Sequence, residues 1–316
     1  MRDRADRQIL YNVAKMYYLE GKKQEEIAAL LKRSRSSVSM LLTEAREAGI
    51  VEIKLKNPLG NDDELSELFE SRFGLSKCYV VPTSLRDTGL LIKLVAESAV
   101  DVFNAELRSN DTIGVAWGRT CYEFMSQYYN DSLHLDLNLV PLIGGSNLTL
   151  KRYQLNHMVR DFAEKLNAVP HFIHAPAMAD SLDDYRLYRS SSVMKRITGL
   201  WEKMDMAVVS IGMPPGPEEN DVPDYLGGMV VTSPEFRNRA GDICGWPIDE
   251  QGHFLSGKAA DLLIACGPDQ LRKTKKVFGL VAGLEKRNAV RAGLLSGIID
   301  YLIIDEQTAR AVADDM

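Results

Sequence analysis

Gln24-Glu-Glu-Ile-Ala-Ala-Leu-Leu-Lys-Arg-Ser-Arg-Ser-Ser-Val-Ser-Met-Leu-Leu42 is the stretch that decides the fold of the first part of this chain. Its apolar residues recur at helical spacing on both sides of Ser34, a residue type that commonly begins a helix. Two short helices joined by a tight turn are typical of the helix-turn-helix, which places its second helix in the major groove of DNA. The sequence therefore predicts a DNA-binding head.

Three helices are expected in this head: one over about 6–20, one over 24–31, and one that begins near Ser34 and ends before Gly49. The alternating apolar and charged residues of 50–55 indicate a short wing-like strand. A common core should form from Ile9, Val13, Met16, Tyr17, Ile27, Leu30, Leu31, Val38, Leu41, Leu42 and Ala45, with small Ala28 at the helix crossing.

The outward side chains of the third helix predict contacts with DNA. Short hydroxyl donors and one guanidinium at its start are suited to reading base edges, namely Arg35, Ser36, Ser37 and Ser39. Basic residues around them are suited to phosphates, which position a protein without specifying sequence, namely Lys22, Lys23, Lys32, Arg33 and Arg46. The alternative is an ordinary three-helix bundle with a solvated basic face.

Charge is distributed unevenly along the chain. Residues 1–56 carry 12 Lys and Arg against 8 Asp and Glu, whereas the remaining residues carry 26 against 36. Only the head therefore has the net positive charge that favours binding to a phosphate backbone.

The four cysteines are scattered without paired spacing, which disfavours a disulfide framework or a zinc site and favours a reducing cytoplasm. No apolar run is long enough to span a bilayer, so no membrane association is expected. His157, His171 and His174 lack a nearby carboxylate or cysteine to complete a metal site, and we assign them structural roles. We therefore expect no metal and no cofactor.

The rest of the chain predicts an α/β protein. Its domains are expected to be a helix-turn-helix domain at 1–57, a linker helix at 58–76 with an apolar stripe that could pair with a second copy, and an effector domain at 77–316. Short apolar runs alternate with helical patterns, which favours a mostly parallel, doubly wound sheet. These runs are Cys78–Val81, Thr112–Ala116, Leu137–Leu142, Phe172–His174, Met206–Ile211, Val277–Ala282 and Tyr301–Ile304.

Ligands of such sheets bind at the carboxyl ends of strands. Trp117-Gly-Arg-Thr120 follows one predicted strand and begins a helix, offering backbone N–H groups, a hydroxyl and a guanidinium to an anion. Gly144-Gly-Ser146 follows the next strand as a second loop that a ligand could approach closely. Each loop taken alone could be only a turn.

Two charged residues complete the predicted effector site. Asp242 could accept hydrogen bonds from sugar hydroxyls, although a turn or cap aspartate is the simpler alternative. Lys286 lies in the first turn of a predicted helix, where a cation opposes the helix dipole unless an anion lies between them. Its alternative is a solvated lysine.

Five motifs in matching order, from about Ile9 to Val312, resemble the SorC family of bacterial sugar-responsive transcription regulators. They are the helix-turn-helix spacing of 24–42, Val115-Ala-Trp-Gly-Arg-Thr120, Ile143-Gly-Gly145, Ala240-Gly-Asp-Ile-Cys-Gly245, and the run from Leu280-Val-Ala-Gly283 through Lys286 to Ile299-Asp-Tyr-Leu-Ile-Ile-Asp-Glu-Gln-Thr-Ala309. The chain departs from the family at Met40, where an arginine is common, and at Leu284, where a glycine is common.

This resemblance implies an effector domain related in fold to sugar-phosphate isomerases and deaminases, an effector that is a phosphorylated sugar or polyol, and a homodimer or homotetramer on double-stranded operator DNA. It implies effector contacts from Trp117, Gly118, Arg119, Thr120, Gly144, Gly145, Ser146, Asp242 and Lys286. We therefore expect a non-enzymatic regulator of a carbohydrate catabolic operon, with a repressor favoured. The alternatives are a sugar-phosphate isomerase or deaminase with a DNA-binding head, and a DNA-binding protein whose sensor has degenerated.

Overall fold

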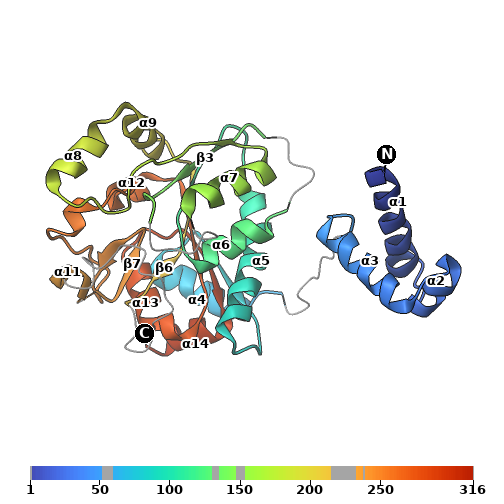
Figure 1. Cartoon of the computed structure of the whole chain (residues 1–316). Helices are drawn as coiled ribbons and strands as arrows, with labels where there is room; N and C mark the ends of the chain where they lie inside the picture. Colours follow the sequence, from blue (N-terminus) through green and yellow to red (C-terminus); the bar gives the residue numbers. More distant parts are fainter. Residues whose placement is uncertain are drawn as a thin grey trace. The chain divides into compact units, whose positions relative to one another are not determined.

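The computed structural model describes residues 2–51, 60–129, 135–146, 154–214, 233–237 and 239–315. The chain forms two compact units, Met1–Pro58 and Leu59–Met316, and each is described by itself (Figure 1).

The small unit contains α1 (Arg2–Ala14), the π-helical turn η1 (Lys15–Leu19), α2 (Gln24–Leu31) and α3 (Arg35–Glu47). Ser34 begins α3 as predicted, because its Oγ accepts a 3.1 Å hydrogen bond from the Ser37 backbone N–H. Lys32 ends α2 in the left-handed backbone region with φ of 51°, which makes the turn between the two helices tight.

The core of the small unit is smaller than the apolar pattern predicted. Val13, Ile27 and Val38 are fully buried at its centre. Leu30 is 63% exposed, so its predicted place in the core is wrong: α2 buries the face that carries Ile27 and Ala28, and Leu30 lies beyond the edge of that face. The predicted strand at 50–55 falls largely on residues that lie outside the described part.

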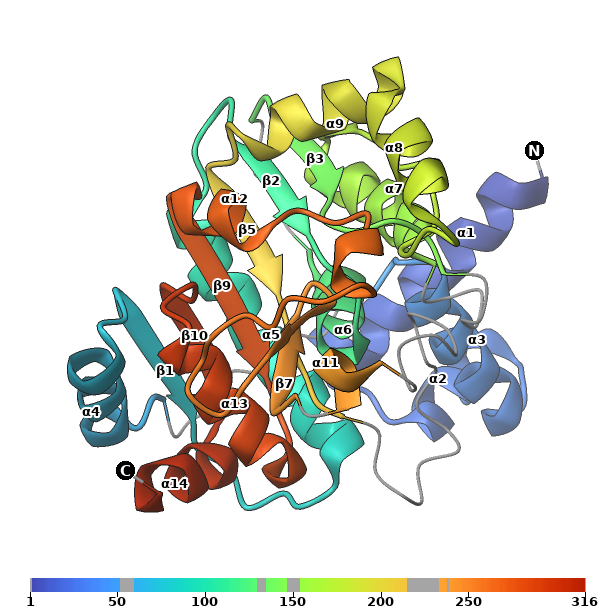
Figure 2. The same cartoon turned by 90° about the vertical axis from the view of Figure 1, so that its left-hand side faces the viewer.

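The large unit is built on a seven-stranded sheet in which every pair of neighbouring strands is parallel. The central positions of its strands are apolar because helices cover both faces. In spatial order they are β1 (Lys77–Val81), β10 (Tyr301–Asp305), β9 (Lys276–Val281), β5 (Met206–Val209), β2 (Thr112–Val115), β3 (Asn138–Pro141) and β4 (Val169–Pro170) (Figure 2).

The order of strands reverses between β2 and β5. From β2 the chain adds β3 and β4 on one side, and it then crosses to add β5, β9 and β10 on the other. The crevice at such a reversal is where ligands of doubly wound sheets bind. The predicted α/β fold with a mostly parallel sheet is confirmed.

Two helical layers enclose the sheet, each with its own apolar cluster. One layer contains α5 (Thr88–Glu106), α6 (Arg119–Gln127) and α7 (Leu155–Leu166), whose aromatic rings pack edge to face. The other contains α4 (Asp63–Phe73), α9 (Ser192–Trp201), α12 (Pro268–Lys273), α13 (Arg287–Leu295) and α14 (Glu306–Asp314), and α8 (Leu182–Ser190) precedes α9.

A second, antiparallel sheet was not predicted. It consists of β6 (Ile211–Gly212), β7 (Gly241–Ile243) and β8 (Trp246–Ile248), with α11 (Pro234–Arg237) before β7 and the 3-10 helices η3 (Ala260–Leu262) and η4 (Leu284–Lys286) after it. The predicted single strand Met206–Ile211 therefore divides at Ser210 into β5 of the large sheet and β6 of the small one.

The predicted strand Phe172–His174 is wrong, and the edge strand β4 lies just before it. After a last backbone hydrogen bond of 2.8 Å from His171 to Leu139, the chain leaves the sheet. The side-chain amide of Asn156 then takes the place of a neighbouring strand, because it bonds both the N–H and the carbonyl oxygen of Ile173, at 3.2 and 2.9 Å.

The helix predicted as a linker is packed within the large unit. Leu65 and Phe69 of α4 are buried against β1, so the prediction that this stripe is free for a second copy is wrong for both residues. Leu68 remains 44% exposed.

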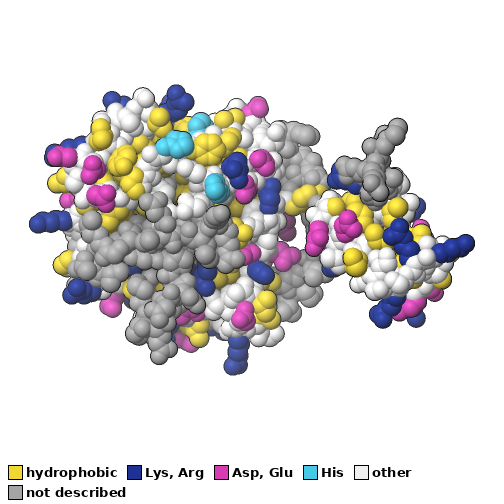
Figure 3. Space-filling view, viewed as in Figure 1, with side chains coloured by type: hydrophobic (Ala, Val, Ile, Leu, Met, Phe, Trp, Pro, Cys, Tyr) yellow, Lys and Arg dark blue, Asp and Glu magenta, His cyan; other side chains and the backbone are white. Residues whose placement is uncertain are grey.

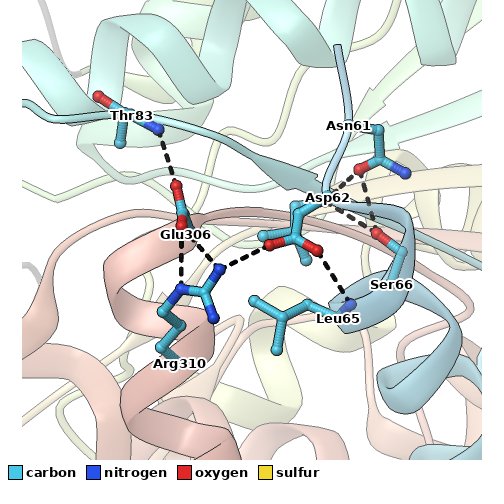
Figure 4. Close-up of polar contacts among 8 residues, drawn as sticks. Asn61, Asp62, Leu65, Ser66, Thr83, Glu306 and Arg310 are labelled. Carbon is cyan, nitrogen blue, oxygen red and sulfur yellow. Dashed lines mark hydrogen bonds and ion pairs between the residues drawn. The ribbon is translucent and has the colours of Figure 1, made fainter. Parts of the chain in front are cut away.

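Polar contacts fasten the start of α4 (Figure 4). Asn61 accepts a 2.8 Å hydrogen bond from the backbone N–H of Val80, and the Asp62 carboxylate caps α4. Arg310 of α14 donates to Asp62 and to Glu306, at 2.9 Å each. The beginning of α4 is therefore tied to both β1 and α14.

Candidate functional site

The carboxyl ends of β2, β5 and β9 meet where the strand order reverses. Gly118 follows β2 with φ of 120°, a backbone conformation that favours glycine, and it is the N-cap of α6 with no side-chain cap of its own. A β-carbon at Gly118 would lie 3.6 Å from that of Ser210, the residue that follows β5. The start of α6 thus adjoins the end of β5, and the helix start is an arrangement that favours anions.

The four residues of the first predicted effector loop are not equivalent. Trp117 and Thr120 are buried, and Trp117 belongs to the apolar cluster under α5 and α6. Arg119 is exposed, and its charge is close enough to lower the pKa of Lys286. Arg119 and the Gly118 backbone are therefore the parts of this loop that are accessible to a ligand.

Lys286 comes from the turn after β9 and is the N-cap residue of α13. Its Nζ donates a 2.9 Å hydrogen bond to the carbonyl oxygen of Ile211 in β6. Burial and then the charge of Arg119 lower the pKa of this ammonium, and Asp242 acts against them. The sequence prediction placed Lys286 at a helix start, and it lies there.

The turn that carries Lys286 is held in place by a hydrogen bond to β10. The Asp305 carboxylate at the end of β10 accepts a 3.0 Å hydrogen bond from the Gly283 N–H and also caps α14. Asp305 is fully buried, so this link is shielded from water. A shielded hydrogen bond to a charged acceptor is stronger than one at the surface.

Asp242 lies on β7 directly opposite Gly212 of β6. A β-carbon at Gly212 would come within 2.3 Å of the Asp242 Oδ2, so any other residue there would force this carboxylate to move. Burial raises the pKa of Asp242, whereas Arg239 and then Lys286 act to lower it. The structure therefore brings Asp242 and Lys286, which are far apart in sequence, into one electrostatic cluster.

Sequence reasoning missed two residues of this cluster, Arg239 and Ser210. The Nε of Arg239 lies 3.8 Å from the Asp242 Oδ2, and 9% of its side chain is exposed. Its guanidinium also lies over the Phe236 ring, with Cζ 5.6 Å from the ring centre. The signal available was a cation three residues before Asp242, and for Ser210 a single polar residue inside an apolar run.

The Gly144-Gly-Ser146 loop follows β3 but presents no free amide at its glycines. The Gly144 N–H bonds the carbonyl oxygen of Ile264 and the Gly145 N–H that of Ala175, at 2.9 Å each. A β-carbon at Gly144 would lie 2.2 Å from the Pro176 oxygen. The close approach that these glycines allow is to neighbouring backbone, and Ser146 is buried beside it.

On the small unit, the predicted DNA-contacting residues surround the start of α3. Arg33, Arg35, Ser36, Ser39 and Arg46 are exposed. Arg35 forms an exposed ion pair of 2.9 Å with Glu25 of α2. Figure 3 shows Lys and Arg side chains projecting from this unit with acidic groups beside them.

The remaining predicted contacts lie around α2. Lys22 is paired with Glu20 and is partly buried, Lys23 is the N-cap residue of α2, and Lys32 is its C-cap. Ser37 is partly buried and its N–H is used by Ser34. Sequence reasoning gave no role to Met40, which is 72% exposed on the same helix.

Two negative findings hold for the part of the chain that the structure describes. No group of three or more His, Cys, Asp or Glu side chains is placed to hold a metal ion. None of the described helices combines the length and apolar character that crossing a membrane requires.

Comparison with known proteins gives consistent results. Residues 57–313 match the sugar-binding domain family. The chain is 26% identical to the sorbitol operon regulator of Klebsiella pneumoniae, over 98% of both chains, and 25% identical to the deoxyribonucleoside regulator of Bacillus subtilis (strain 168), over 99% of this chain and 100% of that one. The crystal structure of the full-length sorbitol operon regulator SorC superposes with a TM-score of 0.75 at 25% identity, covering 96% of this chain and 98% of that one.

A helix-turn-helix unit followed by a doubly wound sugar-binding unit defines a class of transcription regulators that sense small molecules. The chain belongs to the SorC family of sugar-binding transcription regulators.

Proposed function

We propose that this protein is a repressor of a carbohydrate catabolic operon, released from or retained on its operator by a phosphorylated sugar or polyol. The observation that carries the proposal is the cluster at the strand reversal, where the Lys286 ammonium on the Ile211 oxygen adjoins Asp242 and Arg119.

The chemistry of the cluster suits a ligand with two kinds of polar group. The start of α6, Arg119 and Lys286 offer positive charge to a phosphate. Asp242 offers carboxylate oxygens, which accept hydrogen bonds from sugar hydroxyls. A ligand bound between them would touch the ends of β2, β6 and β9 together, and so would change how these elements pack.

The small unit would bind operator DNA. Arg35, Ser36, Ser37 and Ser39 at the start of α3 would read bases, and the flanking Lys22, Lys23, Lys32, Arg33 and Arg46 would contact phosphates. A two-fold symmetric operator needs two heads, which requires a homodimer or homotetramer.

Effector and operator binding would then be coupled through one free energy, typically about 1–3 kcal/mol. Reciprocity follows: if the effector weakens operator binding, operator DNA weakens effector binding by the same factor. No catalytic role is proposed for Asp242 and Lys286, since a regulator needs them only to bind.

The first experiment measures the melting temperature of the full chain against phosphorylated sugars and polyols and their unphosphorylated parents. A ligand that binds only the folded state raises this temperature. The ligand found is then added to a fluorescent DNA fragment that the full chain has selected from a random library. A change of about five-fold or more in DNA affinity supports the proposal.

Two results would overturn it. If no sugar, polyol or phosphate ester stabilises the folded chain, the sensor assignment fails. If a ligand stabilises the protein but leaves its affinity for the selected DNA unchanged, binding is established and regulation by that ligand is refuted.

A further inference from the structure

We propose that Arg239 is a ligand-binding residue that makes this site selective for sugars carrying an anionic group, with its Nε–H reserved for an oxygen of that group. This inference rests on the proposed function, because it concerns the same effector site. It adds a residue that lies outside every motif on which the family resemblance was based.

The Nε of Arg239 is buried and has no hydrogen-bond partner among the described residues. Among the described residues, Arg239 forms an ion pair with Asp242, whose Oδ2 lies 3.8 Å from Nε, too far for a hydrogen bond. An unmet buried donor costs roughly 1–3 kcal/mol, and more when it is charged. Unmet buried donors are rare in folded proteins, and one beside a binding site is suited to an acceptor on a ligand.

The rest of the guanidinium is held in place. One of its terminal nitrogens, Nη1, donates to the Phe236 carbonyl oxygen at 2.5 Å, and its plane lies over the Phe236 ring. The charge of Asp242, 3.8 Å from Nε, also attracts it. With these contacts made, the position of the Nε–H is fixed before a ligand arrives, which lowers the entropy cost of binding.

The charges around Arg239 are unbalanced. Arg239 and Lys286 both act on Asp242, and Arg119 acts in turn on Lys286. Among the described residues, the other carboxylate that acts on Lys286 is Glu285, which is exposed on η4. Among the described residues, two cations therefore act on the Asp242 carboxylate and a third acts on Lys286, and a ligand that brings negative charge would offset this positive charge.

The shape of guanidinium narrows the ligand class. Its planar N–H groups match the paired oxygens of a phosphate or carboxylate, whereas a neutral hydroxyl gains much less from them. The ligand is thus a sugar or polyol bearing a phosphate ester or a carboxylate. Asp242, whose Oδ2 lies 3.8 Å from the Arg239 Nε, would accept hydrogen bonds from the hydroxyls of the same ligand.

The test compares calorimetric affinities of the full chain for three probes: a sugar phosphate that stabilises it, the matching sugar acid, and the neutral parent sugar. The variants are Arg239→Gln and Arg239→Lys. Arg272→Gln is the matched control, because Arg272 also lies over a phenylalanine ring, at 5.5 Å from Phe254, and pairs with an aspartate at 3.3 Å, yet it is half exposed.

We expect Arg239→Gln to lose at least tenfold affinity for the anionic probe that binds, with the affinity for the neutral parent changed less than twofold. Arg239→Lys should lose less affinity for the anionic probe, since lysine keeps the positive charge although it lacks the planar set of N–H donors. Arg272→Gln should match the unsubstituted protein. Comparing the phosphate with the sugar acid identifies which anion the site takes.

Other outcomes separate the two proposals. If Arg239→Gln binds the anionic probe as tightly as the unsubstituted protein, or loses both probes equally, this inference is overturned while the proposed function stands. If no sugar of any charge binds the unsubstituted protein, the proposed function fails and this inference fails with it. If Arg239→Gln does not fold because Asp242 is left without a cation, the Arg239→Lys variant, which keeps a cation beside Asp242, gives the comparison: it should lose affinity for the anionic probe and keep that for the neutral parent.

Discussion

The ammonium group of Lys286 and the carbonyl oxygen of Ile211 are joined by a hydrogen bond of 2.9 Å, so the turn after β9 and the strand after β5 hold each other. The first segment follows a strand of the large sheet, and the second is β6 of the small antiparallel sheet, so this bond links the two sheets. A ligand that binds the Lys286 ammonium in place of the Ile211 carbonyl would separate the turn after β9 from β6. The site would then have two arrangements, one with this hydrogen bond and one without it.

Lys286→Ala should abolish or strongly weaken the response to effector and leave affinity for DNA within about twofold, since the small unit folds on its own core. Arg35→Ala should weaken DNA binding and leave effector affinity unchanged. The Arg35 side chain is exposed at the start of α3, and one base contact is worth about 1–3 kcal/mol. Fluorescence anisotropy with selected DNA, with and without effector, measures both. Loss of DNA binding in Lys286→Ala with intact effector affinity would contradict this division of labour.

Asp242→Asn should change how stability depends on pH. Burial raises the pKa of Asp242 above its usual value of 3.8 in the folded state. Between 3.8 and the raised value the folded protein holds a proton that the unfolded chain has lost, so this group lowers the free energy of unfolding as pH rises through that window. Relative to Asp242→Asn, the unsubstituted protein should become progressively less stable from about pH 4 upward.

Urea unfolding at several pH values measures this difference. Asp183→Asn is the control, because that side chain is 92% exposed. A constant stability difference between Asp242→Asn and the unsubstituted protein across the acid range would refute the prediction.

Gly144→Ala should destabilise the large unit by about 2 kcal/mol or more, since the added β-carbon would lie 2.2 Å from the Pro176 oxygen and backbone cannot move aside cheaply. Gly145→Ala is the matched control: its β-carbon would meet nothing closer than 3.8 Å, and we expect a change below about 1 kcal/mol. Denaturant titration compares them, and equal stabilities would show that the loop relaxes freely.

The four cysteines should be nearly unreactive in the folded protein. All are buried, and burial raises the pKa of the Cys121 thiol to about 12, while Lys286 acts weakly against it. Because the thiolate is the reactive form, labelling by a thiol reagent at neutral pH should be at least roughly a hundredfold slower than in denaturant. Mass spectrometry after timed labelling measures this, and rapid modification of Cys121 in folded protein would contradict it.

The sequence predicted the elements whose pattern is local. Six of the seven expected strands lie in the large sheet because both of its faces are covered, which makes Val277–Ala282 and its neighbours apolar at every position. Ser34 was predicted as a cap from its residue type alone. Asp242 and Lys286 were predicted as site residues, and the structure brings their charges together.

What the sequence could not predict depends on partners far along the chain. The strands β6, β7 and β8 have two or three residues each, too few to show periodicity. The partners of the Gly144 and Gly145 amides lie at Ile264 and Ala175. In the sequence, Arg239 cannot be told from a surface arginine, because only folding buries it beside Asp242. The apolar stripe of α4 predicts a packing partner, but it does not identify that partner as β1.

The contacts of Asn61 and Asp62 determine where the chain can be cut in two. A protease that cleaves at 52–59 would leave α4 in place on β1 and α14, and the released fragment should keep its melting transition and its sugar affinity. A fragment that begins at Lys77 would instead leave bare the surface that Leu65 and Phe69 cover, and it should aggregate. The practical unit for crystallising the sensor alone therefore starts before Asn61.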